Sequence, residues 1–130
     1  MKKIGFVKDH QFRLESEVTE QTYRRDKVYV DFFGHLNSED ATSFYSFYKN
    51  DNMIYSTDSE LSVIELKTSK ITGTTKKELD NGDYVYVPIE TEKYLEELYG
   101  MTWRIPDPNW ISGSGPSCIK LEGKYGYLEK

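Results

Sequence analysis

The stretch Lys27-Val28-Tyr29-Val30-Asp31-Phe32-Phe33-Gly34 is the most apolar run in an otherwise polar sequence. In an extended chain, successive side chains point to opposite faces, so Asp31 shares one face with Tyr29 and Phe33. β-Branched and aromatic residues fall on both faces, which is typical of a strand that is covered on both sides. The stretch therefore predicts a core strand with an acid in its middle.

A carboxylate between two aromatic side chains is costly to ionise unless another group compensates its charge. Four kinds of compensation are open: a bound metal, a basic partner, a helix N-terminus, or a position at the exposed end of the strand. No other acid in the sequence has a comparable apolar setting. Asp31 is therefore the candidate functional acid, and the structural alternative is an ordinary ion pair with a lysine or arginine or exposure at the strand end.

The length and composition of the chain indicate one domain, residues 1–130. The net charge of −5 and the lack of an arginine-rich stripe argue against nucleic acid as the main partner. No apolar run approaches the ~20 residues that span a bilayer, and no signal peptide is recognisable, so we expect a cytoplasmic protein without a membrane span. The single cysteine, Cys118, excludes an intrachain disulfide. The oligomeric state is left open.

Alternating patterns predict most of the secondary structure. Residues 11–18 and 27–34 are expected to form an antiparallel hairpin, with the polar residues 20–26 as its turn. Residues 40–48 suit a helix or a strand. Turns are expected at 49–52 and 80–83, short strands at 53–55, 61–66 and 84–87, and an exposed extended segment at 68–77.

Residues 91–99 predict the one secure helix, with Thr91 as its N-cap and Gly100 just after its end. Tyr94, Leu95 and Leu98 form an apolar stripe along it. The fold class expected from this order is α+β, a mainly antiparallel sheet with one helix. The core is expected at about 11–111, and the Gly- and Ser-rich residues 112–130 are expected to be a loosely packed tail.

Three segments carry a resemblance. Residues 28–33 read Val-Tyr-Val-Asp-Phe-Phe, residues 85–100 begin Val-Tyr-Val-Pro and end Tyr-Gly, and residues 102–106, Thr-Trp-Arg-Ile-Pro, precede Trp110. In this order they resemble the fukutin/LicD family of phospholigand transferases, over roughly residues 12–111. The resemblance implies a partial nucleotidyltransferase-like fold. It also implies transfer of a phospho-alditol or phosphocholine group from a CDP-activated donor to a glycan acceptor.

The resemblance assigns roles to four residues. Asp31 matches the third metal-binding acid of the family, so it would be catalytic and would bind Mg²⁺ or Mn²⁺, which favour carboxylate and phosphate oxygens. Trp103, Arg104 and Trp110 would contact sugar or phosphate. Packing of an extended segment over the helix is the alternative for the two tryptophans.

The sequence departs from the family upstream of Asp31, because no D-x-D pair precedes it. We therefore expect the C-terminal part of a longer protein or a remnant, inactive as an isolated chain. The alternative function is a non-catalytic or degenerate module that binds a glycan or a protein partner through surface tyrosine and tryptophan side chains.

Overall fold

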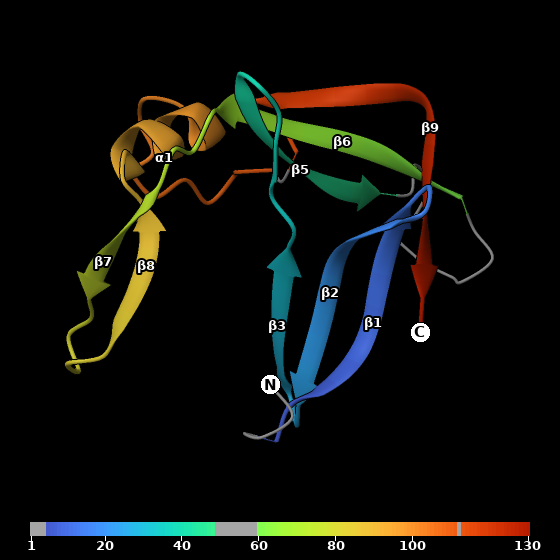
Figure 1. Cartoon of the computed structure of the whole chain (residues 1–130), viewed down its shortest axis with the longest axis horizontal. Coiled ribbons are helices and arrows are strands. Elements are labelled where there is room, and N and C mark those ends of the chain that lie inside the picture. The colour runs from blue at the N-terminus through green and yellow to red at the C-terminus, as the bar shows by residue number, and fades with distance from the viewer. Residues whose placement is uncertain (1–4, 49–59, 112) are drawn as a thin grey trace. The chain divides into compact units, whose positions relative to one another are not determined.

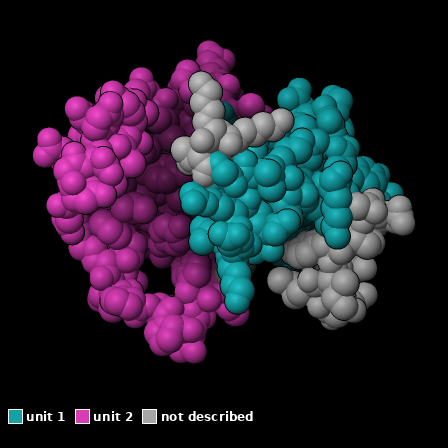
Figure 2. Space-filling model, turned by 90° about the horizontal axis from the view of Figure 1, so that it is seen from below, with its two compact units in different colours: residues 1–35, 44–65, 119–130 teal, residues 36–43, 66–118 magenta. Residues whose placement is uncertain are grey.

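A computed structural model describes residues 5–48, 60–111 and 113–130. Strands hold 57% of these residues and helix holds 8%. The chain divides into two compact units, coloured separately in Figure 2. Unit 1 comprises residues 1–35, 44–65 and 119–130, and unit 2 comprises residues 36–43 and 66–118. Each unit is described by itself.

The described elements follow one another as shown in Figure 1. They are β1 (Val7–Leu14), β2 (Glu17–Arg25), β3 (Val28–Phe33), β4 (Leu36–Asn37), β5 (Ala41–Tyr48), β6 (Glu60–Ser69), β7 (Thr74–Glu78), β8 (Tyr84–Pro88), α1 (Thr91–Tyr99) and β9 (Cys118–Glu129). Seven strands form one sheet in the order β3-β2-β1-β9-β6-β5-β4, and β7 and β8 form a separate two-stranded sheet.

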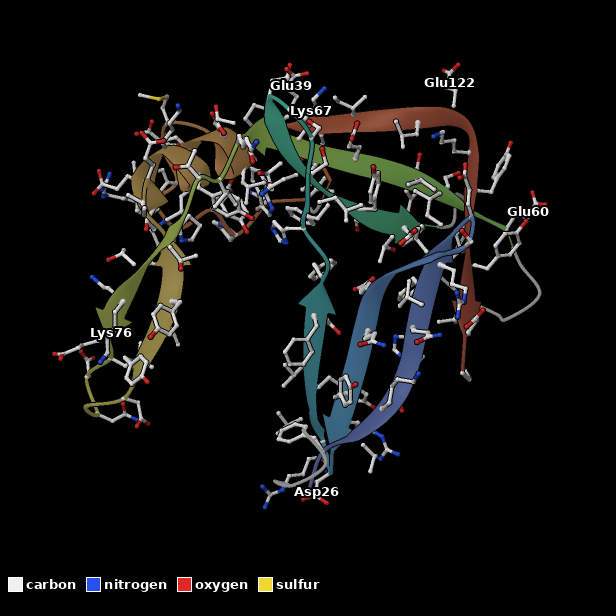
Figure 3. All side chains as sticks on the ribbon, in the orientation of Figure 1. Asp26, Glu39, Glu60, Lys67, Lys76 and Glu122 are labelled. Carbon is white, nitrogen blue, oxygen red and sulfur yellow. The ribbon has the colours of Figure 1, made fainter. Side chains whose placement is uncertain are left out.

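In unit 1, β1, β2 and β3 form an antiparallel meander (Figure 1). Asp26, labelled in Figure 3, lies in the tight turn between β2 and β3 with φ of 53°, a conformation that aspartate tolerates better than most residues. Strand β9 pairs antiparallel with β1, with Phe12 opposite Leu128. The carboxyl-terminal strand therefore takes a central place in the sheet.

The core of unit 1 is a single cluster of buried apolar side chains from four strands. Its members are Phe12, Leu14, Phe47, Leu61, Val63 and Leu128. The rings of Phe12 and Phe47 stack with their centroids 5.4 Å apart. A Cβ atom on Gly126 would lie 2.1 Å from the Phe47 ring, so only glycine lets β9 approach so closely.

In unit 2, the hairpin of β7 and β8 closes through a turn at residues 80–83, in which Gly82 has φ of 89°. Lys76, labelled in Figure 3, lies on β7 with its ammonium 3.8 Å from the centroid of the Tyr84 ring. Helix α1 follows β8. The Thr91 hydroxyl donates 2.6 Å to the Pro88 carbonyl oxygen, and the N-cap is Glu90 rather than the predicted Thr91.

The structure corrects the predicted fold class. The mostly antiparallel β structure, with one helix among the described residues, is not the predicted α+β fold and not a nucleotidyltransferase-like fold. The predicted helix at 91–99 is confirmed, as are the turn at 80–83 and the strand after it. Helix and strand were both open for residues 40–48, and Ala41–Tyr48 form the strand β5.

The predicted hairpin between residues 11–18 and 27–34 is wrong, because the polar residues 17–25 are themselves the strand β2 that separates β1 from β3. Residues 118–129, expected in a loose tail, form β9, in which Leu128 is buried. The turn predicted at 49–52 and the strand predicted at 53–55 lie outside the described residues.

Candidate functional site

Strand β3, which carries Asp31, is the outermost strand in the order of the sheet, and β2 is its hydrogen-bonded neighbour. Most of its side chains are exposed, and Tyr29 is 59% exposed. The prediction of a core strand is therefore wrong. Alternating apolar residues on both faces do not reveal how many neighbouring strands and layers cover them.

Asp31 is exposed, and the Thr22 hydroxyl donates a 2.6 Å hydrogen bond to its Oδ1 atom. Thr22 lies directly opposite Asp31 in the antiparallel pair. The charge of Asp31 is thus compensated by solvent and by one hydroxyl donor from β2. Among the described residues, no group of three or more His, Cys, Asp or Glu side chains could hold a metal ion. Binding of Mg²⁺ or Mn²⁺ at Asp31 stays a prediction.

The acid in the costly setting is Glu20, on β2. Glu20 lies opposite Phe12 on one side and opposite Phe33 on the other, so it shares its face of the sheet with the core residue Phe12. Burial and, secondly, the negative charge of Asp31 raise the pKa of Glu20 to about 7. Sequence reasoning missed Glu20 because it placed residues 20–26 in a turn. The β-favouring residues of Val18-Thr19-Glu20-Gln21-Thr22-Tyr23 were the available signal.

An open hollow of about 280 Å³ adjoins Glu20 in unit 1. Its lining residues are Val18, Thr19, Glu20, Gln21, Phe32, Phe33 and Gly34. Thr19 is only 5% exposed, and its hydroxyl has no hydrogen-bond partner among the described residues. Thr19 lies at a register shift between β1 and β2, a bulge that changes how the neighbouring side chains are directed.

A second hollow, of about 190 Å³, lies in unit 2 just after helix α1. Tyr99, Thr102, Trp103, Ile105, Pro106, Asp107 and Trp110 line it. We call it the aromatic hollow. Gly100 follows the last helical residue as its C-terminal cap with φ of 92°, which suits glycine, and the chain then folds back in short turns. In the last of these turns, Asp107 accepts hydrogen bonds from the backbone N–H groups of Asn109 and Trp110.

The rings around the aromatic hollow are held by their neighbours. The centroids of the Tyr99 and Trp110 rings are 5.4 Å apart at an angle of 66°. The Arg104 guanidinium carbon lies 4.2 Å from the centroid of the Trp103 ring, and the same guanidinium is paired with Glu92 on α1. The indole N–H of Trp103 is buried and lacks an acceptor among the described residues.

The structure thus brings together two of the predicted substrate-binding residues, since Trp103 and Trp110 line one hollow. Arg104 does not line this hollow and is engaged with Trp103 and Glu92. Asp31 belongs to unit 1 and the three other residues to unit 2.

The nine residues of α1 are too few and too polar to cross a membrane. Among the described residues, no helix is long and apolar enough to do so. The resemblance to the fukutin/LicD family rests on the three sequence segments given above. No family model, no curated protein and no solved structure matches this chain.

Proposed function

We propose that this chain is a non-catalytic module that binds a glycan in the aromatic hollow of unit 2. The observation that carries the proposal is the arrangement of Tyr99, Trp103 and Trp110 around one hollow, with Asp107 as a further lining residue. Ligand sites in proteins are typically concave and lined by aromatic side chains, with a few polar groups that orient the ligand.

This lining matches the chemistry of a sugar ring. The negative face of an aromatic ring attracts the polarised C–H groups on the flat side of a pyranose. Asp107 uses one carboxylate oxygen for the N–H of Asn109, and its other oxygen is available to sugar hydroxyls. The buried N–H of Trp103 needs an acceptor, and a sugar oxygen is a group that supplies one.

The hollow is also held in place before a ligand arrives. The Arg104 guanidinium covers part of Trp103 while paired with Glu92, so the indole is supported by helix α1. A Cβ atom on Gly115 would lie 2.0 Å from the Leu98 carbonyl oxygen and 3.3 Å from the Trp110 ring. The segment around Gly115 therefore packs tightly behind Trp110. A site whose side chains are already ordered loses less entropy on binding.

The transferase activity implied by the resemblance stays a prediction, together with its CDP-linked donor. Its structural basis is weakened by the fold, because a nucleotidyltransferase-like sheet is what would hold the donor and the metal. A binding module requires only a shaped surface, and the aromatic hollow supplies one. A glycan, which the resemblance named as acceptor, is the ligand that the ring-lined geometry favours.

Calorimetric titration of the whole chain with soluble tetrasaccharides of glucose, N-acetylglucosamine and mannose tests the proposal. We expect one of them to bind, and Trp110→Ala to lower that affinity about fivefold or more, since stacking of a base on one aromatic ring, a comparable contact, contributes about 1–3 kcal/mol. Tyr86→Ala is the matched control, because Tyr86 is an exposed aromatic residue of the same unit outside the hollow. A proline-rich peptide is titrated in the same way. If it binds and no tetrasaccharide does, the ligand of the hollow is a protein partner and not a glycan.

A further inference from the structure

The Glu20 carboxyl in unit 1 lacks both a counter-charge and a hydrogen-bond donor among the described residues. It lies beside a second acid, Asp31, whose charge disfavours ionisation of Glu20. The Arg24 guanidinium on β2 donates to Asp9 at 3.2 Å, and the Arg13 guanidinium on β1 pairs with Glu129 at 2.6 Å, so both cations are engaged with other acids. An ionised Glu20 is therefore left to be compensated by something that binds.

The hollow at Glu20 has a second polar group without a partner. Thr19 lines the same hollow as Glu20 and is only 5% exposed. Its hydroxyl has no hydrogen-bond partner among the described residues. A buried hydroxyl without a partner destabilises the fold, and an N–H donor that enters the hollow would supply that partner. Phe32 and Phe33 provide aromatic walls next to these groups.

We propose that this hollow binds a primary ammonium group carried on an alkyl stem. An ammonium offers donors for the Glu20 carboxylate and the Thr19 hydroxyl, and the negative charge of Asp31 on the neighbouring strand adds to its attraction. Aromatic side chains attract organic cations and accommodate the alkyl stem. A metal ion would need a third strong ligand, and the described residues provide no such group of three.

The charged and titratable groups along this face define how binding depends on pH. They are Asp31 on β3, His10 on β1 and Arg24 on β2, and Asp31 is the one that raises the pKa of Glu20. A carboxyl that titrates near 7 is about tenfold more ionised at pH 8 than at pH 6. An ammonium bound by the ionised form should therefore bind about tenfold more tightly at the higher pH.

Calorimetry with 1,5-diaminopentane and with N-acetyl-lysine amide, at about pH 6 and pH 8, tests this inference. We expect affinity to rise about tenfold with pH, and Glu20→Gln to abolish both the rise and most of the binding. Preference for the diamine would identify a free polyamine as the source of the ammonium, and preference for the lysine derivative would identify a protein side chain. Both preferences support an ammonium site.

Equal affinity at the two pH values, or unchanged binding to Glu20→Gln, would overturn the inference. His10→Gln is the control, because imidazole groups in general change charge between pH 5 and 8. This variant should keep the pH dependence, and its loss would assign the effect to the histidine. Asp31→Asn, a substitution at an exposed position, provides a second variant. It should weaken binding and reduce the difference in affinity between the two pH values. Trp110→Ala should leave amine binding unchanged, so this inference and the glycan proposal fail independently.

Discussion

The rings of Tyr99 and Trp110 meet edge to face, with their centroids 5.4 Å apart and their planes at 66°. Tyr99 is the last residue of helix α1, and Trp110 lies beyond a segment that contains two prolines. The contact therefore ties the end of the helix to the extended segment that follows it, and it forms one wall of the aromatic hollow.

Tyr99→Ala should weaken glycan binding about fivefold, because an aromatic pair of this geometry contributes about 0.5–1.5 kcal/mol to holding the Trp110 indole. Tyr99→Phe keeps the ring and removes only the hydroxyl, so it should bind like the unchanged chain. Calorimetric affinities of the two variants make the comparison. Equal affinity of Tyr99→Ala and Tyr99→Phe would show that the pair does not support the site.

Gly115→Ala should lower the free energy of unfolding of unit 2 by about 2 kcal/mol and weaken glycan binding. Its added Cβ would lie 2.0 Å from the backbone oxygen of Leu98, so the segment next to Trp110 has to move. Gly34→Ala is the control, because a Cβ there meets only the Thr19 carbonyl oxygen at an ordinary 3.6 Å. Thermal unfolding curves that coincide for the two variants would contradict this packing.

Glu97→Ala should destabilise unit 2 by about 1 kcal/mol, since hydrogen bonds to charged groups contribute about this much or more. The Glu97 carboxylate accepts from the backbone N–H of Ser69 at 2.8 Å and from the Ser69 hydroxyl, and so joins α1 to the end of β6. Glu96→Ala, one residue earlier on the same helix, is the matched control. Urea unfolding should show a larger loss of stability for Glu97→Ala than for Glu96→Ala. An equal loss in both would mean that the charge on the helix, and not the hydrogen bonds to Ser69, is responsible.

Glu20→Gln should stabilise unit 1 at high pH and not at low pH. The folded-state pKa of Glu20, about 7, lies above its ordinary value of 4.5, so the folded chain loses stability as pH rises through this window. The amide cannot ionise and escapes this loss, which we place at about 1 kcal/mol above pH 7 after allowing for solvent screening. Unfolding curves near pH 4 and pH 8 test the sign. A variant less stable than the parent chain at pH 8 would contradict it.

Asp31→Asn should lower the pKa of Glu20 part of the way from about 7 toward 4.5. Burial is the larger cause of the raised pKa and remains, whereas the charge of Asp31 is removed. Asp26→Asn is the control, because Asp26 lies in the turn between the same two strands with φ of 53°, which asparagine also tolerates. Carbon-13 NMR titration of the Glu20 carboxyl follows both variants. An unchanged pKa in Asp31→Asn would rule out the charge coupling.

Local signals predicted the elements that depend on near neighbours in sequence. The helix at 91–99, the turn at 80–83 and the strand that follows it are all determined by capping, glycine and proline residues within a few positions. Trp103 and Trp110 line one hollow for the same local reason, since only seven positions and two short turns separate them; their role in binding stays a prediction.

The errors concern pairings between distant residues. Strand β3 lies at the edge of the sheet because it pairs with β2 and is the last strand in the order. The sequence of β3 does not show which strands it pairs with. The polar strand β2 is stabilised by pairing on both sides, and the glycine-containing strand β9 fits against Phe47 through Gly126. In both strands, pairing with distant residues decides a position in the sheet that the local sequence does not show. Glu20 was missed because its raised pKa depends on burial and on Asp31, across the strand pair.

The central claim is that the aromatic hollow binds a glycan, and the indole N–H resonances of Trp103 and Trp110 report on it most directly. Nitrogen–proton NMR spectra recorded during titration with the glucose, N-acetylglucosamine and mannose tetrasaccharides should show both resonances shifting to saturation with one of these sugars, at a dissociation constant of ~0.1–1 mM. If neither indole resonance shifts with any of the three at ~10 mM sugar, the proposal is contradicted.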